Sequence, residues 1–373
     1  MGFLVYLLPW VVQRRRKTAV IAGLVGVLIV AYERWQIVPA DTGWTLMAGF
    51  AVNAVLSAVF GLVASIRTTD RVGFLMFAGK LAAAAVLGLA LLGASAPMFH
   101  ARQYHALGGV TVKAAGSEAF SDIDITELVV VPQETARNKA RQVVGQYGSQ
   151  FSIGKFYLQK FKGDLVYAAV LEPTGLFTQM SAGASPGYVV VSATDQSAPA
   201  KLVTGFSFRY TEDGFWGHWL PRYVRAQFPA KVFSEFSFEL DETGRPFWVG
   251  SAGHYAIGVG AVKIDSVIVV DPQTGEATLY PLDRIPDWIE QAVPEEVAAA
   301  YARWWGEYEL GWWNSVLTQR GVKVLTEVTS AGRQMVGVNG ADGKFRYFSG
   351  MTSPNKSDTS LIGYMVIDSA LGR

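Results

Sequence analysis

Histidine and cysteine are the side chains best suited to bind transition metals or to move protons near neutral pH, and this sequence has four histidines and no cysteine. The histidines are not spaced as metal ligands on one helix or turn, and no thiolate is present to complete a site. They are His100, His105, His218 and His254. No phosphate-binding loop and no Gly-x-Gly-x-x-Gly after a strand is present either. We therefore expect no catalytic residue, no cofactor, no metal site and no enzymatic activity.

The acidic residues around one turn raise a second possibility, a calcium site. Asp271 and Glu276 flank the turn Pro272–Gly275, and Asp265 precedes it. Their spacing lacks the alternating oxygen ligands of a calcium loop. An Asp that opens a turn usually accepts hydrogen bonds from the backbone that follows it. We therefore expect Asp271 to stabilise the turn rather than to bind an ion.

Two polar residues lie inside apolar stretches, where they would be suited to line an ion or proton path. Lys80 is the ionisable residue of its stretch, and Asn53 lies in the stretch before it. Lys80 is only about two and a half turns from Arg71, so its long side chain can instead reach the aqueous face. Asn53 is suited to a hydrogen bond with a neighbouring helix. Both are retained as possible intramembrane polar sites.

Aromatic side chains crowd one predicted helix, Glu295–Leu317, and form the third group of candidates. At helical spacing, several of them follow one face. One interpretation is a surface that binds a partner or touches a membrane. The other is a buried core that joins two of the small folded modules expected after residue 100, the second and the third. Aromatic side chains on two faces of a helix are, however, hard to bury within one small module. The possible partner-binding residues are Trp304, Trp305, Tyr308, Trp312 and Trp313.

The composition limits the classes of protein to which this chain can belong. Half of the 373 residues are hydrophobic, 17% are charged, and the mean hydropathy is +0.23. These values are too apolar for a soluble enzyme of this size and too polar for a chain that lies wholly in lipid. A net charge of +1 provides no basic field for a nucleic acid. The absence of cysteine excludes disulfides and thiolate metal sites.

The apolar excess lies in the first hundred residues, where three stretches are long enough to cross a bilayer, which takes about 20 helical residues. They are Thr18–Val38, Trp44–Ile66 and Val72–Met98. Basic residues precede the first stretch and lie between the second and the third, so the positive-inside rule places the N-terminus in the cytoplasm. Residues after about 100 are then extracytoplasmic. Met1–Val12 precedes the basic cluster, which favours an interfacial segment over a signal peptide.

Beyond the membrane part, three segments share one layout, in which a helical stretch precedes a hairpin and a further strand. The helical stretches are Glu134–Gln146, Trp219–Phe228 and Glu295–Leu317. The hairpins are Phe156–Pro173, Phe236–Gly253 and Arg333–Ser353, with turns near Gly163, Gly244 and Gly343. Tyr167, Trp248 and Tyr347 occupy matching positions. We therefore expect tandem modules, each with a helix and an antiparallel sheet.

The stretch Val267–Ala277, VIVVDPQTGEA, resembles the closing hairpin of PepSY-type domains. These are small extracytoplasmic modules with one helix on an antiparallel sheet, associated with inhibition of proteases or with regulation at the cell envelope. More broadly, the chain is similar to bacterial polytopic membrane proteins with PepSY-like extracytoplasmic modules. The likeness lies in Leu165–Gly175, Pro186–Asp195, the Val267–Ala277 turn and the Trp-rich helix. The resemblance implies an architecture without a specific chemistry.

The third module differs from the second at its end. Met365–Asp368 corresponds to the strand before the turn of the second module, and Ala370–Gly372 corresponds to the turn. The return strand, Ala277–Tyr280 in the second module, has no counterpart before Arg373. An unpaired edge promotes aggregation, so we expect either a truncated chain or a partner that supplies the strand.

These observations predict an α+β membrane protein, with three N-terminal transmembrane helices followed by tandem helix-plus-antiparallel-sheet modules of the PepSY-like kind. The expected divisions are an interfacial segment (residues 1–17), a three-helix transmembrane domain (18–99), a first extracytoplasmic α+β module (100–210), a second, PepSY-like module (211–286), and a long aromatic helix with a third, incomplete module (287–373).

The expected function is that of a non-enzymatic scaffold or regulatory subunit anchored in the bacterial cytoplasmic membrane. Its outer modules would bind other envelope proteins or copies of the same chain, with membrane lipid as the other partner and no nucleic acid. The alternative is an oligomeric transporter or channel component, with Lys80 and Asn53 lining a path. A third possibility is an envelope hydrolase whose nucleophile and base come from distant positions.

Overall fold

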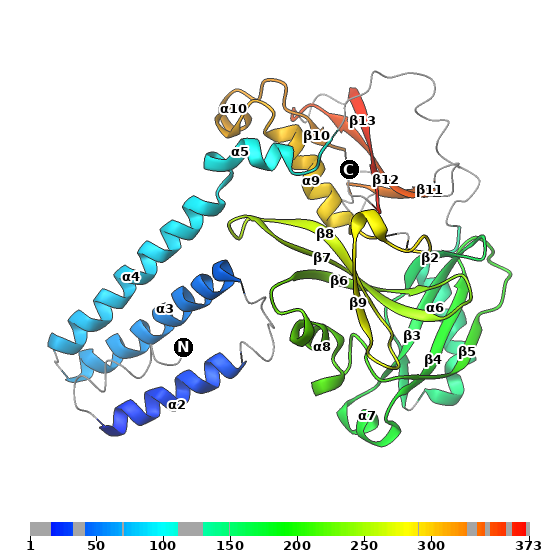
Figure 1. Cartoon of the computed structure of the whole chain (residues 1–373), viewed down its shortest axis with the longest axis horizontal. Helices are drawn as coiled ribbons and strands as arrows, with labels where there is room; N and C mark the ends of the chain where they lie inside the picture. Colours follow the sequence, from blue (N-terminus) through cyan, green and yellow to red (C-terminus); the bar gives the residue numbers. More distant parts are fainter. Residues whose placement is uncertain are drawn as a thin grey trace. The chain divides into compact units, whose positions relative to one another are not determined.

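The computed structural model describes residues 16–32, 42–68, 71–110, 130–148, 150–289, 291–326, 334–339, 344–355 and 360–370 (Figure 1). The fold is α+β with several antiparallel sheets, as the alternating patterns predict. The chain divides into two compact units: Met1–His100 with Arg225–Val232 and Tyr255–Val262, and Ala101–Val224 with Phe233–His254 and Lys263–Arg373. The predicted interfacial segment Met1–Val12 and the turn at Asp342-Gly343 lie outside the described residues.

Apolar helices make up most of the described part of the first unit. They are α2 (Arg16–Tyr32), α3 (Gly43–Thr68) and α4 (Arg71–Ser95), and α5 (Pro97–Ala106) continues the chain after α4. Within the described residues, one helix, Phe74–Ala106, is long and apolar enough to cross a membrane. Val20–Tyr32 and Gly43–Val59 are apolar but shorter. The structure thus gives one candidate membrane helix, and the three predicted spans stay a prediction.

Small side chains let α3 and α4 pack closely. A Cβ atom at Gly61 would lie 1.9 Å from the Phe77 ring, so a larger residue at this position would force the ring or the helix to move. Phe77 is fully buried. After α4 the helical path bends at His100, whose backbone has φ −125° and ψ 17°. The bend falls where the polar residues of α5 begin.

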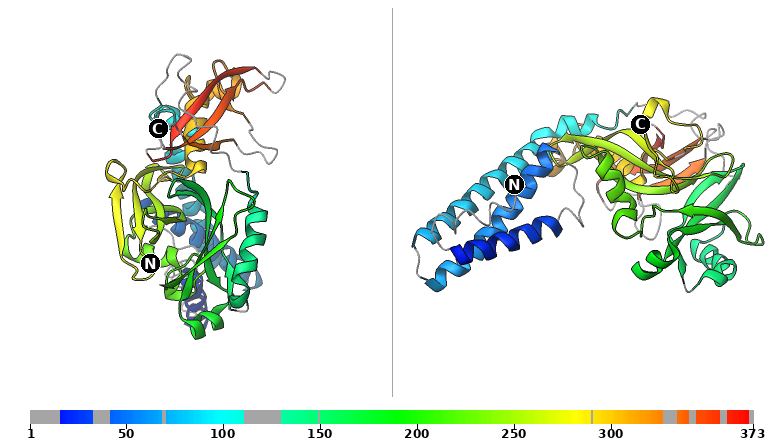
Figure 2. Two further views of the ribbon diagram at one scale, coloured as in Figure 1. Left: turned by 90° about the vertical axis from the view of Figure 1, so that its right-hand side faces the viewer. Right: turned by 60° about the horizontal axis from the view of Figure 1, so that its bottom comes forward.

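The first module of the second unit is a helix on one face of an antiparallel sheet (Figure 2). Its elements are α6 (Gln133–Val144), η3 (Gly145–Tyr147), β1 (Phe151–Ile153), β2 (Tyr157–Phe161), β3 (Asp164–Pro173), α7 (Leu176–Ala182), β4 (Ser185–Ser192) and β5 (Lys201–Phe208). β3 pairs with β1 and β2 on one side and with β4 on the other, and β5 follows β4. Lys162 and Gly163 both have positive φ, as a two-residue hairpin turn requires. The predicted helix and hairpin are therefore confirmed.

The second module repeats this plan with strands in sequence order. Its elements are η4 (Trp216–His218), α8 (Leu220–Gln227), β6 (Val232–Leu240), β7 (Pro246–Ile257), β8 (Ala261–Val270), β9 (Ala277–Pro281) and η5 (Leu282–Arg284). The sheet order is β6-β7-β8-β9, and β8 pairs with β9 antiparallel. Gly244 lies in the turn before β7 with φ +90°. The predicted hairpin and its return strand are confirmed.

The third module contains α9 (Glu295–Glu307), α10 (Trp312–Leu317), β10 (Val324–Leu325), β11 (Val336–Asn339), β12 (Phe345–Thr352) and β13 (Leu361–Asp368). β12 pairs antiparallel with β10, β11 and β13. The prediction of one continuous helix over Glu295–Leu317 is wrong. The chain leaves helical geometry after Glu307 and reverses at Gly311, whose φ of +89° favours glycine.

One hydrogen bond recurs at the aromatic position that the sequence matches in the three modules. In each, the buried ring on the central strand donates to a backbone carbonyl that lies before the module's helix. The donor and acceptor pairs are Tyr167 with Val131 (3.1 Å), Trp248 with Tyr210 (2.9 Å) and Tyr347 with Val293 (3.1 Å). A buried polar ring atom must find such a partner, so this bond fixes the segment before the helix on the sheet.

A second bond closes the same framework. The N–H of the residue that carries the accepting carbonyl donates to a carbonyl just beyond a strand of the sheet. The pairs are Val131 with Ala193 (2.9 Å), Tyr210 with Pro272 (3.1 Å) and Val293 with Ser369 (2.8 Å). We call these two recurring bonds the framework. They show an internal structural repeat, whereas the PepSY-like character of the modules stays a prediction.

Candidate functional site

The aromatic candidates of α9 lie in a junction with α5. The ring of Trp304 is 4.8 Å from that of Tyr104, edge to face, and Tyr308 lies 6.1 Å from the same ring. Tyr104 and Tyr308 are buried, and Trp304 is half-buried. Burial, together with the neighbouring Glu307 carboxylate, raises the pKa of Tyr308 to about 12. Tyr308 and Trp304 therefore serve mainly to hold α5 on α9.

Trp305 is held by polar contacts as well as by packing. His105 Nδ1 lies 2.8 Å from the Trp305 carbonyl oxygen, and the two rings stack at 6.1 Å. The Lys323 ammonium lies 4.9 Å from the centroid of the Trp305 ring, a cation–π contact. The junction thus joins the end of α5 to α9 through two consecutive residues of each helix.

Tyr301 connects α9 to the second module. Its buried hydroxyl accepts a hydrogen bond of 3.1 Å from the backbone N–H of Ile264 in β8. This contact fits the interpretation of the aromatic stretch as a core between the second and third modules. The interpretation as a core applies to the face of α9 that carries Tyr301, and not to the residues after Gly311.

The remaining aromatic candidates lie on α10, where Trp312 is half-buried and Trp313 is 60% exposed. The two rings pack edge to face at 4.8 Å. Leu310, Val316 and Leu317 are exposed beside Trp313. The structure thus separates the predicted cluster into a buried part on α9 and an exposed part on α10.

The two intramembrane candidates lie on the contact face of α3 and α4. The Lys80 ammonium donates to Ser57 Oγ at 2.8 Å and lies 5.4 Å from the Phe77 ring centroid. Asn53 Nδ2 donates to the Gly49 carbonyl at 2.9 Å, within its own helix. Ser57 and Asn53 are one turn apart and both buried. In this arrangement Lys80 joins α4 to α3 rather than reaching for the aqueous face.

The turn at Asp271 behaves as predicted. Asp271 Oδ1 accepts hydrogen bonds from the backbone N–H groups of Gln273 (2.8 Å) and Thr274 (3.2 Å), and Oδ2 accepts one from Arg245. Burial opposes ionisation, but the Arg245 and backbone bonds outweigh it, so the pKa of Asp271 is lowered. Among the described residues, no group of three His, Asp or Glu side chains is arranged to hold a metal ion.

A buried carboxyl group near the junction of the first two modules is absent from the candidates raised by the sequence. Glu172, near the end of β3, is 3% exposed, and its Oε2 has no hydrogen-bond partner among the described residues. The Thr211 hydroxyl and the Asp213 backbone N–H donate to this carboxyl group. Burial and the nearby carboxylates outweigh these bonds and raise the pKa of Glu172 to about 8. Glu172 therefore holds a proton at neutral pH.

Further acidic groups surround Glu172. The hydroxyl of Tyr157 on β2 donates a short hydrogen bond to Glu212, whose pKa is raised by burial. Burial and the Glu212 carboxylate raise the pKa of Tyr157 as well. Lys155 pairs with Glu235 at 2.7 Å. The signal in the sequence was a single carboxylate in the otherwise apolar run LVYAAVLEP.

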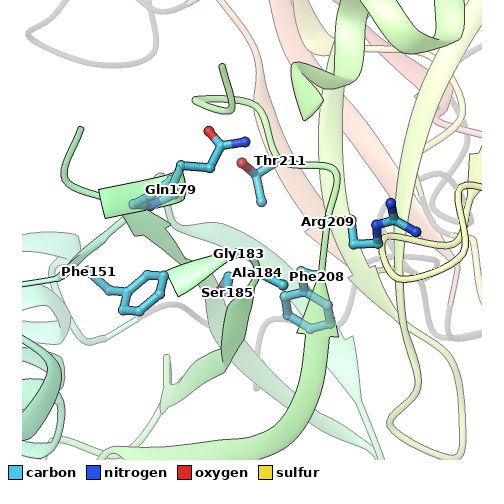
Figure 3. A pocket seen from close by; sticks show the side chains of 9 residues that line it. Phe151, Gln179, Gly183, Ala184, Ser185, Phe208, Arg209 and Thr211 are labelled. Carbon is cyan, nitrogen blue, oxygen red and sulfur yellow. The ribbon is translucent and has the colours of Figure 1, made fainter. Parts of the chain in front are cut away.

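Beside this cluster is a small hollow between α7 and the end of β5 (Figure 3). Its lining includes Gln179, Ser185, Phe208 and Thr211. The Gln179 side-chain oxygen accepts a 2.7 Å hydrogen bond from the Phe215 N–H, which ties α7 to the segment before η4. The Gln179 side-chain oxygen in the lining is therefore already used within the protein.

Gly183, Ala184 and Ser185 line this hollow. They begin the string Gly183-Ala184-Ser185-Pro186-Gly187, which has the Gly-x-Ser-x-Gly form of a hydrolase nucleophile turn and is missing from the candidates above. Such a turn runs from a strand into a helix and exposes its serine. Here the order is reversed, from α7 into β4, and Ser185 is buried with its hydroxyl directed to the Gly187 carbonyl at 3.4 Å. This string is the start of a strand and not a nucleophile turn.

No protein-family model, no curated protein and no solved structure matches the chain.

Proposed function

We propose that this protein is a non-enzymatic scaffold or regulatory subunit anchored in the bacterial cytoplasmic membrane. In this proposal the three apolar N-terminal helices span the membrane, the N-terminus is cytoplasmic, and the PepSY-like modules after about residue 100 bind other proteins outside. The candidate membrane helix Phe74–Ala106 and the threefold repeat of the framework support this arrangement.

The observation that carries the binding role is the edge of the third sheet. Within the described residues, β13 pairs with one strand, β12. The corresponding strands β4 and β8 each have a second neighbour, β5 and β9. Leu361, Ile362 and Val366 of β13 are exposed, so this edge is apolar as well as eight residues long.

The outer strands of the other two sheets carry features that protect an edge. β5 begins with the exposed Lys201, contains Gly205 at φ +98°, and has a register irregularity against β4. β9 is five residues long and ends at Pro281. Lysine, bulges, proline and short length are common protections against edge-to-edge pairing. β13 contains neither lysine nor proline and exposes apolar side chains, although its pairing with β12 also has a register irregularity, between Met351 and Thr352.

An edge of this kind fits β-strand addition. An extended segment of a partner protein would pair with the backbone of β13, and its alternate side chains would lie beside Leu361, Ile362 and Val366. Backbone pairing supplies affinity, and the apolar contacts select the segment. The proposed partner is thus a protein with an exposed extended apolar segment, or a copy of this chain.

Site-specific photocrosslinking in native membranes tests this proposal. A photoreactive phenylalanine analogue is placed at Ile362, which is 53% exposed, and, as a matched control, at Met180 on α7, which is 65% exposed. We expect a discrete crosslinked species from position 362 and none from position 180. Ile362→Lys should abolish co-purification of that species, because an edge lysine opposes strand addition.

Equal crosslinking at the two positions, or a complex that survives Ile362→Lys unchanged, would contradict the proposed binding mode. Mass spectrometry of the crosslinked product then identifies the partner. A product of this chain with itself would make the assembly homo-oligomeric.

A further inference from the structure

The exposed face of α10 has the composition of a membrane-interface segment. Trp313, Val316 and Leu317, with Leu310 before the helix, present apolar side chains to solvent. The sequence from Leu310 to Gln319 contains no charged residue, and Arg320 follows it. Tryptophan beside aliphatic residues and a flanking basic residue is typical of chain that lies in the headgroup region of a bilayer.

The segment that precedes α10 is held by contacts with α5. Tyr104 and His105 are among the last residues of the helix Phe74–Ala106, the candidate membrane helix. Tyr104 contacts Trp304 at 4.8 Å, and His105 Nδ1 lies 2.8 Å from the Trp305 carbonyl oxygen. The end of α9 is therefore held against α5, the polar segment that follows the bend at His100.

The reach from this junction to α10 is short. Tyr308, which contacts Tyr104, is four residues before Trp312, the first residue of α10. Consecutive Cα atoms are 3.8 Å apart, so the two Cα atoms are within about 15 Å of each other. α10 is thus joined to α5 through a short segment of chain.

The size of the face favours lipid over a folded protein partner. A buried aromatic side chain covers about 150 to 250 Å² and the three aliphatic neighbours are smaller, so the whole face covers on the order of 500 Å². A stable protein interface buries about 800 Å² on each partner. A lipid surface has no such minimum, because each inserted side chain adds to the binding.

We propose that α10 is a second membrane contact: Leu310, Trp313, Val316 and Leu317 insert into the headgroup region of the bilayer that the apolar N-terminal helices are proposed to span. This inference rests on the proposed membrane anchoring. Its consequence is that the third module contacts the membrane surface through α10.

The absence of native cysteine allows a direct test in the full chain. Single cysteines at Trp313 and, as a matched control, at Trp216 are labelled with an environment-sensitive nitrobenzoxadiazole dye in lipid nanodiscs. Trp216 is the closest control, since it is 54% exposed and lies on η4 of the second module. A third label, at Leu89 of α4, reports whether the candidate membrane helix itself is in lipid.

We expect the emission at position 313 to be blue-shifted and quenched about twofold by lipids that carry a shallow spin label. The emission at position 216 should be quenched by aqueous iodide instead. Leu317→Cys should repeat the result of position 313, which guards against a local disturbance from loss of Trp313. Unchanged far-UV circular dichroism shows that the labelled variants fold.

Two results would overturn the inference. Iodide quenching at 313 equal to that at 216 would place α10 in water, and protection from both quenchers would mean that protein covers it. The label at Leu89 separates this failure from that of the proposed function. Lipid quenching at 89 without quenching at 313 removes the α10 contact alone, whereas no lipid quenching at 89 removes the membrane anchoring itself.

Discussion

The first and third modules share the framework bonds but differ at two other positions. Glu172 lies five residues after Tyr167 on the central strand, and Thr352 lies five residues after Tyr347 in the third module. The other difference is at the edge, where β5 covers β4 but no described strand covers β13. The strand pairings agree otherwise, since Tyr167 lies opposite Val191 and Tyr347 lies opposite Ile367.

This comparison separates what makes a module from what distinguishes one module from another. The framework bonds involve buried groups that must be paired, so they are required wherever the module folds. A buried carboxyl group and an apolar edge that no described strand covers are not required for folding, and each is unfavourable to the isolated module. Features that lower stability and occur in only one module are the ones to test for function.

The largest expected effect concerns Glu172. Its pKa of about 8 in the folded protein lies above the ordinary value of 4.5, so the folded state binds the extra proton between these values. The stability that this group contributes is therefore greatest below pH 4.5 and falls as the pH rises toward 8. At about 1.4 kcal/mol per unit, the loss between pH 5 and pH 8 is on the order of 4 kcal/mol. Thermal unfolding followed by tryptophan fluorescence should show a decrease in Tm of roughly 10 °C.

Removal of the carboxylate tests the cause. Glu172→Gln keeps the shape without the titration, so its Tm at pH 8 should exceed that of the wild type and its pH dependence should be shallower. A residual slope of the same sign is expected from Glu212, whose pKa is also raised. Glu242→Gln, at an exposed position of the β6–β7 turn, is the matched control. Identical pH profiles for wild type and Glu172→Gln would exclude Glu172 as the titrating group.

The sequence predicts the modules better than it predicts their differences. Alternation, turn residues and matching aromatic positions depend on local geometry, so the hairpins and the positions of Tyr167, Trp248 and Tyr347 are read correctly. The helix over Glu295–Leu317 is read as continuous because its aromatic spacing persists through two glycines, Gly306 and Gly311. The helix in fact ends after Glu307, and the positive φ that Gly311 adopts before α10 cannot be inferred from spacing.

The polar groups that the sequence misses depend on contacts between distant segments. Glu172 accepts hydrogen bonds from Thr211 and Asp213, about forty positions away, and neither local sequence pattern predicts these contacts. Lys80 is recognised as a polar residue in an apolar stretch, but its pairing with Ser57 requires the packing of α3 on α4. Local patterns thus identify unusual residues, whereas the tertiary structure assigns their partners.

The smaller effect comes from a pair of glycines that occupy the same position in β4 and β13. Gly187 lies four residues before Val191, and Gly363 lies four residues before Ile367, the residues opposite Tyr167 and Tyr347. A Cβ atom at Gly187 would lie 1.9 Å from the Val203 carbonyl oxygen of β5, whereas one at Gly363 would meet nothing within 4 Å. Gly187→Ala should therefore destabilise the protein by about 1 to 3 kcal/mol. Gly363→Ala should change stability by less than about 0.5 kcal/mol.

The glycine pair also tests the proposed strand addition at β13, because Gly363→Ala is expected to weaken binding without lowering stability. If a partner strand covers β13 in the way that β5 covers β4, the methyl group of Gly363→Ala collides with that strand. The crosslink from position 362 should then weaken in Gly363→Ala while Tm stays within about 2 °C of the wild type. An undiminished crosslink would mean that the partner approaches β13 in another geometry. A large loss of Tm would instead mean that the edge is already covered within the protein, and the contrast between the first and third modules would no longer hold.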